Sequence, residues 1–190
     1  MANNGSPHLL CSIGTAEYKT ISYRLGDKTH TNRFAPVALA RLLGLHGAKA
    51  SVLVTREARE KWYPALAAEL HAAGLDPQPV EMPQGRTEEE IFEAVHQVIA
   101  VVKAREKVVL DVTFSLRHLP FVYLAALVYL TAYREVEIDG IFYGAYELRQ
   151  AENGEAPILE VTPLFRLTQW YHAVQIAQES GDLRAMTQML

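Results

Sequence analysis

The sequence predicts an α/β domain with a mostly parallel six-stranded sheet, helices on both faces and antiparallel last strands. Three observations support this prediction. Short β-rich runs alternate along the chain with helical runs, which is typical of strand–helix–strand units. The length of 190 residues fits one domain, and 49% apolar residues can supply its core. We expect the domain to cover residues 1–182, followed by a short tail or linker at 183–190.

Six short runs of apolar and β-branched residues predict the strands: Leu9–Ile13, Ala50–Val54, Gln78–Met82, Val108–Val112, Glu137–Tyr143 and Pro157–Val161. The fourth run, Val108–Val112, is apolar throughout, so we expect it near the centre of the sheet. The third run, Gln78–Met82, carries prolines, which indicate an edge strand. The polar turn Gln150–Glu155 leaves a short link between the last two strands, so we expect these to be antiparallel neighbours.

One extended segment lies outside these six strands. Residues Tyr18–Leu25 alternate in polarity and end at Gly26-Asp27, a pair that is typical of tight turns. This pattern predicts an extended excursion or one arm of a hairpin. Asn32 follows at a position suited to cap the next helix.

Five helical runs separate or follow the strands. They begin near Phe34, Arg56, Thr87, Leu119 and Leu164. The third has the clearest start, because Thr87 and Glu90 have the spacing of a capping box. Its expected apolar stripe consists of Ile91, Val95, Val98, Ile99 and Val102. The fourth run, Leu119–Arg134, is apolar on all sides, which predicts a helix that is buried on most sides.

The charge balance and the cysteine content exclude several classes of protein. Lys and Arg number 18 against 22 Asp and Glu, a net charge of −4, which argues against a broad basic face for long nucleic acids. A local pocket for a short anion needs few cations and is not excluded. The single cysteine, Cys11, excludes an internal disulfide framework and suits a reducing compartment.

No targeting or membrane segment is evident. The N-terminal residues MANNGSPH lack the basic-then-apolar pattern of a signal peptide. The longest apolar stretch, Leu119–Leu130, is shorter than the roughly 20 residues that a membrane span needs. We therefore expect a cytoplasmic protein that does not bind membranes.

Common nucleotide, metal and hydrolase motifs are absent. No GxGxxG follows the first predicted strand and no GxxxxGK[ST] occurs, so neither a dinucleotide site nor a P-loop is predicted. The seven histidines form no HExxH, and Cys11 has no ligand-spaced companion. No GxSxG nucleophile elbow is present. We accordingly expect no cofactor and no metal.

Small hydroxyl residues follow the first and fourth predicted strands, in Ser12-Ile13-Gly14-Thr15 and Asp111-Val112-Thr113-Phe114-Ser115-Leu116-Arg117. Open α/β sheets bind ligands beyond the carboxyl ends of their strands. Hydroxyls, N–H groups at a helix start and one arginine would make a receptor for phosphate or for the polar edge of a base. The same residue types are equally typical of turns and caps, and we expect Asp111 to hold its loop by accepting backbone N–H bonds.

Five segments together resemble the CARF (CRISPR-associated Rossmann fold) sensor domains of type III CRISPR accessory effectors. They are CSIGTAEYKTISY, PQGRTEEEIFEAV, DVTFSLRHLPF, FYGAYE and PILEVTPLFRLTQWYHAV, and they follow the family's order over nearly the whole chain. The most specific part is D-x-T-x-S-x-R-x-x-P, which runs here from Asp111 to Pro120. Phe114 departs from the family, which often has His at this place. The resemblance implies a Rossmann-like fold.

The resemblance also implies a ligand and an assembly. A homodimer would bind one cyclic oligoadenylate of four or six nucleotides in a pocket on its two-fold axis and thereby control antiviral defence. A symmetric cyclic anion suits such an isologous dimer. The residues implied to bind it are Ser12, Gly14, Thr15, Thr55, Arg56, Gln84, Gly85, Thr113, Ser115, Arg117, His118, Tyr143, Gly144 and Glu147.

Alternatives to a sensor domain remain open at this point. Family members usually carry a carboxyl-terminal effector, so the chain is either an excised sensor or a standalone protein. As a standalone ring nuclease it would open the ring without metal, and Ser12, Thr15, Ser115 and Arg117 would align and stabilise the attack of a ribose 2′-hydroxyl. A third reading is an interaction module whose loops only cap helices.

The run Leu119–Arg134 also predicts a dimer surface. Its side chains Phe121, Tyr123, Leu124 and Leu127 exceed what one face of a sheet can cover if the helix is apolar on all sides. We expect part of this surface to pack against a second copy of the chain.

Overall fold

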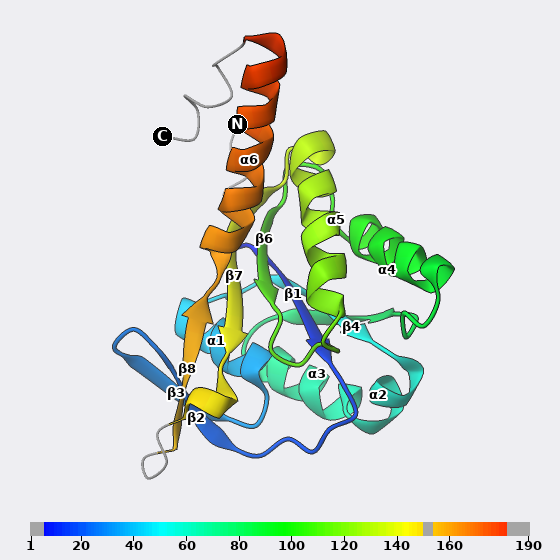
Figure 1. The fold of residues 1–190 in the computed structure, drawn as a ribbon. Coiled ribbons are helices and arrows are strands. Elements are labelled where there is room, and N and C mark those ends of the chain that lie inside the picture. The colour runs from blue at the N-terminus through cyan, green and yellow to red at the C-terminus, as the bar shows by residue number, and fades with distance from the viewer. Residues whose placement is uncertain (1–5, 150–153, 182–190) are drawn as a thin grey trace.

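The structure, a computed structural model, describes residues 6–149 and 154–181 (Figure 1). The domain boundary expected at residue 182, the tail at 183–190 and most of the turn at Gln150–Glu155 lie outside the described residues. In chain order the elements are β1 (His8–Ile13), β2 (Ile21–Leu25), β3 (Lys28–Asn32), α1 (Ala35–Leu43), β4 (Lys49–Val54), α2 (Arg56–Lys61), α3 (Tyr63–Ala72), β5 (Asp76–Glu81), α4 (Glu88–Val101), β6 (Lys107–Asp111), α5 (Leu119–Arg134), β7 (Glu137–Gly144), the 3₁₀ turn η1 (Tyr146–Leu148), β8 (Glu155–Glu160) and α6 (Thr162–Ser180).

The strands form one mixed sheet in the order β3-β2-β8-β7-β6-β1-β4-β5. The pairs β2–β3 and β7–β8 are antiparallel, and the other neighbouring pairs are parallel. The predicted α/β class, the antiparallel pairing of the last two strands and the edge position of β5 are therefore confirmed. The predicted number of six strands was wrong, because the sheet has eight.

The two additional strands form a hairpin beside β8. Its turn is Gly26-Asp27, as the sequence indicates, and Gly26 has a φ of 59° there. β3 reads Lys-Thr-His-Thr-Asn, so no apolar pattern marks it as a strand. β2 joins the sheet through a parallel pairing with β8, which lies far along the chain. Such a long-range pairing depends on tertiary context and cannot be recognised in the local sequence.

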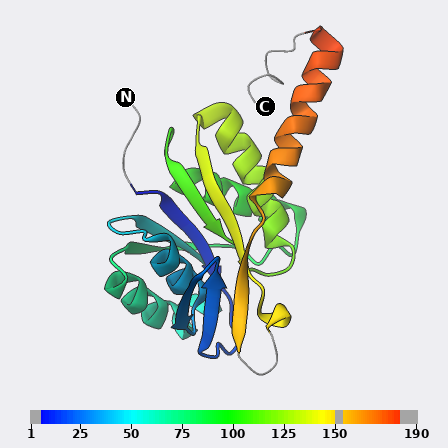
Figure 2. The same ribbon diagram turned by 90° about the vertical axis from the view of Figure 1, so that its left-hand side faces the viewer.

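Two hydrophobic cores lie on opposite faces of the sheet. Leu9 and Cys11 of β1 pack with residues of α1, α2 and α3. Leu10, between them, packs on the other side with residues of α4, α5 and α6. This alternation follows from the two-residue period of a strand. Figure 2 shows the two groups of helices on either side of the sheet, and helices on both faces are thus confirmed.

Most predicted helix boundaries are confirmed, with two corrections that concern their caps. α1 ends at Gly44, which is left-handed with a φ of 71°, and the Thr87 hydroxyl accepts the N–H of Glu90 at 3.3 Å to start α4. The capping box is only half formed, because the Glu90 carboxylate accepts the N–H of Arg86 instead of that of Thr87. Asn32 does not cap α1: it ends β3, and its side chain accepts the N–H of Phe34, which is the N-cap residue.

Helix α5 is buried along one side only, so the prediction that it is covered on most sides was wrong. Tyr123 and Leu127 are fully buried against the sheet and α4, whereas Phe121 at its start is 75% exposed and Tyr133 at its end 76%. Similarly, Ile91 of the predicted α4 stripe is 40% exposed. Within residues 6–149 and 154–181, no helix combines the length and apolar character that crossing a membrane requires.

Candidate functional site

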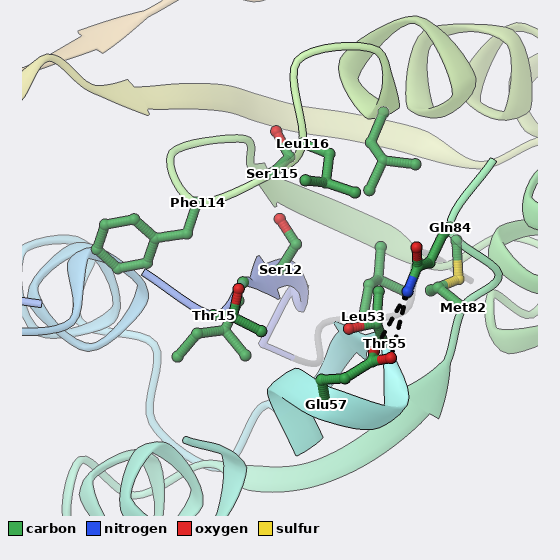
Figure 3. Close-up of a pocket in the computed structure, with 13 residues that line it drawn as sticks. Ser12, Thr15, Leu53, Thr55, Glu57, Met82, Gln84, Phe114, Ser115 and Leu116 are labelled. Carbon is green, nitrogen blue, oxygen red and sulfur yellow. Dashed lines mark hydrogen bonds between the residues drawn. The ribbon is translucent and has the colours of Figure 1, made fainter. Parts of the chain in front are cut away.

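A pocket of about 310 Å³ lies beyond the carboxyl ends of β1, β4, β5 and β6 (Figure 3). β1 has β6 on one side and β4 on the other, so the strand order reverses beside this pocket, as it does at the ligand sites of open α/β sheets. Its lining residues are Ser12, Ile13, Gly14, Thr15, Leu53, Thr55, Glu57, Met82, Gln84, Phe114, Ser115, Leu116 and Leu119.

The pocket contains six of the fourteen residues expected to bind a ligand: Ser12, Gly14, Thr15, Thr55, Gln84 and Ser115. The other eight do not line it: Arg56, Gly85, Thr113, Arg117, His118, Tyr143, Gly144 and Glu147. Sequence reasoning missed Glu57 and the six apolar lining residues. Apolar side chains at strand ends resemble core residues, and Glu57 resembles an ordinary acid in a first helical turn. Only the convergence of the four strand ends distinguishes them.

Ser12 is the most unusual polar residue of the pocket. Its side chain is 3% exposed, and its hydroxyl has no hydrogen-bond partner among the described residues. The buried Tyr123 hydroxyl lies near it. Burial raises the pKa of Tyr123 and the interaction with Ser12 opposes that shift, but the two hydroxyls do not meet the geometry of a hydrogen bond. A buried, unpaired hydroxyl costs free energy, and a ligand that accepts from it would remove that cost.

Thr113 and Ser115 have structural roles in the same region. The Thr113 hydroxyl donates to Asp111 and accepts the N–H of Gly144 at 2.8 Å, which connects the end of β6 to the end of β7. The Ser115 hydroxyl donates to the Val112 carbonyl at 2.8 Å, as in a serine turn. Neither hydroxyl can donate to a ligand without first giving up one of these bonds.

Asp111 holds the loop after β6, as its position in the sequence suggests. One carboxylate oxygen accepts the N–H of Thr113 at 2.8 Å, while the other is buried and has no partner in the described part of the chain. Burial raises the pKa of Asp111 from 3.8 to about 6, and the two hydrogen bonds from Thr113 oppose this shift. The carboxylate therefore holds the loop at the cost of burying a charged group, and it does not line the pocket.

Arg117 is exposed and forms no hydrogen bond or ion pair with the described residues, so its guanidinium is available to an anion. The start of α5 has fewer free N–H groups for a phosphate than the sequence indicates. Leu119 and Phe121 donate their N–H groups to the carbonyls of Leu116 and His118, and Pro120 has no N–H. Phosphate binding at this helix start would therefore depend on side chains and on the preceding loop.

Gln84 and Gly85 contact His118, which brings the loop after β5 against the start of α5. The Nε2–H of His118 donates to the Gln84 carbonyl at 3.1 Å. Gly85 has a φ of 72°, and a Cβ there would lie 2.5 Å from His118 Nε2. The Gln84 amide in turn donates to Glu57 (Figure 3). These contacts fix the far wall of the pocket.

Tyr143, Gly144 and Glu147 form a separate group at the end of β7. The Tyr143 hydroxyl donates to the Glu147 carboxylate, and burial is the main cause that raises the pKa of Tyr143 to about 12. A Cβ on Gly144 would lie 3.1 Å from the Tyr23 ring. Thr113, which accepts the N–H of Gly144, connects this group to the loop after β6.

A ring cluster holds the loop after β1 in place. The Tyr18 hydroxyl accepts the N–H of Gly14 at 2.8 Å, and the centroid of its ring lies 4.3 Å from that of Phe114. The indole of Trp62 donates to the Ala16 carbonyl at 2.8 Å. Ser12 and Thr15 are therefore presented by a loop that is fixed at several points.

A second polar cluster lies at the opposite end of the sheet. His8 forms hydrogen bonds with Ser51 at 2.9 Å and with Glu106 at 3.1 Å. The sequence of an acid, a histidine and a serine resembles the catalytic triad of some hydrolases. The Ser51 side chain is fully buried and, unlike Ser12, does not line the pocket, so we assign the cluster a structural role. Among the described residues, no group of three His, Cys, Asp or Glu is arranged to hold a metal ion.

Comparison with known proteins gives one informative similarity. No family model matches the chain. Over 101 residues, which are 53% of the chain, it is 25% identical to the CRISPR-associated protein MJ1674 of Methanocaldococcus jannaschii. The matched part is 16% of that protein, so the chain spans only a small fraction of the length of this relative.

Proposed function

Given this similarity to a CRISPR-associated protein, we propose that the chain acts in a CRISPR system and that its pocket binds a cyclic oligoadenylate. The observation that carries the proposal is Ser12, whose buried hydroxyl lines the pocket and lacks a partner. A phosphate or ribose oxygen would accept from it. The fit of the segment Asp111–Pro120 to the sensor-domain pattern supports the same ligand.

The size of the pocket supports a ligand that is shared between two chains. A volume of about 310 Å³ is at the lower end of the roughly 300–1,000 Å³ of pockets for drug-sized molecules. It suits about one nucleotide, whereas a ring has four or six. Two pockets related by a two-fold axis would each hold one part of the ring. The proposal is therefore one ring per homodimer.

Apolar groups at the mouth of the pocket fit this assembly. Leu116, in the loop before α5, lines the pocket and is 44% exposed, and Phe121 in the first turn of α5 is 75% exposed. Arg117 stands between them in sequence and has no partner among residues 6–149 and 154–181. A second copy that covered Leu116 and Phe121 would bring two such arginines close to the shared ligand, where charge-assisted bonds to phosphate are strong.

Titration calorimetry with cyclic tetra-adenylate and cyclic hexa-adenylate tests the proposal. We expect one of them to bind with one ring per two chains. Arg117→Ala should weaken binding by about 10- to 100-fold through the loss of a charge-assisted bond. Arg166→Ala, which removes an exposed arginine on α6 and not in the loop after β6, should not.

The absence of binding to either ring would refute the proposal. Chromatography of the ligand recovered from the same samples, kept with a chelator, distinguishes a sensor from a ring nuclease. An intact ring agrees with sensing alone, and a linear product agrees with metal-independent cleavage.

A further inference from the structure

Glu57 and Gln84 form a polar pair at one side of the pocket. Glu57 lies in the first turn of α2, and Gln84 follows β5. The Gln84 Nε2 donates to both carboxylate oxygens of Glu57, at 3.3 and 3.4 Å (Figure 3). The pKa of Glu57 is lowered, first by a hydrogen bond from its own backbone N–H and then by Thr55 and Gln84. Glu57 is thus a carboxylate that can only accept hydrogen bonds.

Glu57 therefore decides which way the Gln84 amide faces. Because a carboxylate cannot donate, the amide nitrogen has to turn toward Glu57, and the amide oxygen faces the open pocket (Figure 3). The backbone of Gln84 is held independently, since its carbonyl accepts from His118 and the next residue, Gly85, packs on the imidazole. The acceptor is oriented before a ligand arrives.

The surroundings of this acceptor suit a nucleobase. Leu53 and Met82 beside it and Leu116 opposite provide apolar contacts for the faces of a ring. Of the polar groups at this edge, the Gln84 oxygen and the Glu57 carboxylate are acceptors. The Thr55 hydroxyl, which accepts the N–H of Ala58, interacts with the same carboxylate. Adenine presents an exocyclic amino group, a donor, whereas a 6-oxopurine presents an acceptor at the same place. An oxo group would leave two acceptors facing each other.

We propose that Gln84 selects amino-bearing bases in this pocket and that Glu57 is the positioning residue that sets its orientation. This inference rests on the proposed function, since it concerns the same pocket and the same ring. It adds to that function a preference for adenine over hypoxanthine, and it assigns this preference to Gln84 and Glu57.

The test compares cyclic tetra-adenylate with the same ring made of inosine, in which an oxo group replaces each amino group. The wild type should bind the adenine ring at least about 10-fold more tightly, because each mismatched edge costs at least one hydrogen bond. In Glu57→Gln the new amide can either donate or accept, so the Gln84 amide can turn its nitrogen to the pocket. The ratio of the two affinities should then fall toward one.

Glu81→Gln is the matched control. It removes the same charge at the end of β5, where Glu81 is exposed, pairs with Arg59 and does not line the pocket. This variant should keep the wild-type ratio. The ratio is the decisive quantity, because a purely structural effect of Glu57→Gln would weaken both rings equally.

The outcomes separate this inference from the proposed function. Equal affinity of the wild type for both rings, or an unchanged ratio in Glu57→Gln, would overturn the selection by Gln84 while ring binding stands. If the calorimetry shows that only the six-membered ring binds, the comparison is made with cyclic hexa-adenylate and its inosine counterpart. If neither cyclic tetra-adenylate nor cyclic hexa-adenylate binds, both proposals are wrong. A thermal melt of each variant confirms that folded proteins are compared.

Discussion

At the scale of single residues, hydroxyl groups that look alike in the sequence have different roles in the structure. Thr113 connects Asp111 to Gly144, and Ser115 closes a turn, whereas Ser12 is buried without a partner. In the sequence, Ser12, Thr15, Thr113 and Ser115 are equivalent, because each has a hydroxyl that could bond to a ligand. Only their hydrogen bonds show which of them has a donor to offer.

Replacing Ser12 by Ala separates ligand binding from stability. The change removes an unpaired buried hydroxyl, so we expect the free energy of unfolding to stay the same or to rise slightly. Binding of cyclic tetra-adenylate should weaken by about 5- to 10-fold, the value of one lost hydrogen bond. Calorimetry and thermal melts measure the two effects. Ser22→Ala, in β2 outside the pocket, is the control, and a large loss of stability in Ser12→Ala would contradict the assignment.

Asp111 predicts a pH dependence of stability. Its pKa is about 6 in the folded protein and near 3.8 when unfolded, so the folded state holds the proton more tightly. The stability this gives is complete below pH 3.8 and is lost as the pH rises through 6. Asp111→Asn keeps an oxygen for Thr113 and has no charge to bury. Relative to wild type, it should gain about 1 kcal/mol between pH 5 and pH 7.5.

Urea unfolding of wild type and Asp111→Asn at both pH values measures this difference. Other titrating groups, such as His8, whose pKa burial lowers, are present in both proteins and cancel in the comparison. A stability difference that does not change with pH would show that Asp111 is already charged at pH 5 in the folded state.

At the scale of elements, the contact between the loop after β5 and the start of α5 closes one side of the pocket. Gly85→Ala should destabilise the protein for two reasons. A positive φ is strained for alanine, and the new Cβ would lie 2.5 Å from His118 Nε2. Gly26→Ala should destabilise the protein through the positive φ alone, since nothing lies within 4 Å of a Cβ there.

We expect Gly85→Ala to cost about 1–2 kcal/mol more than Gly26→Ala in chemical denaturation. Combining Gly85→Ala with His118→Ala should restore part of this excess, because the clash is then gone. If both substitutions lowered the free energy of unfolding equally, the loop would move away from His118 without penalty. The contact with His118 would then not hold the pocket wall in place.

At the scale of the whole molecule, the proposed dimer requires an interface at the pocket end of α5. Phe121→Asp should turn the dimer into a monomer, because it places a charge in an apolar contact. Light scattering of the wild type should give about twice 21.2 kDa, and that of the variant about 21.2 kDa. Tyr133→Asp, at the other end of the same helix and equally exposed, should leave the mass unchanged. A monomer in Tyr133→Asp alone would place the interface at the opposite end.

The sequence by itself determined the elements whose causes are local. The apolar runs of β1 and β6, the cap at Thr87, the end of α1 at Gly44 and the turn at Gly26-Asp27 all follow from neighbouring residues and their conformational preferences. The role of Asp111 is local as well, since it bonds to a residue two positions along. The alternation of strands and helices then determined the α/β class.

Only the tertiary structure decided the features that depend on segments far apart in the chain. The parallel pairing of β2 with β8 enlarged the sheet, and packing on the sheet and on α4 covered one side of α5 but left Phe121 exposed. The pocket needs four strand ends at one edge, and Glu57 can be recognised as part of it only from its hydrogen bond with Gln84. The physical reason is common to all of these features: burial and hydrogen-bond partners are set by neighbours in space, and neighbours in sequence do not specify them.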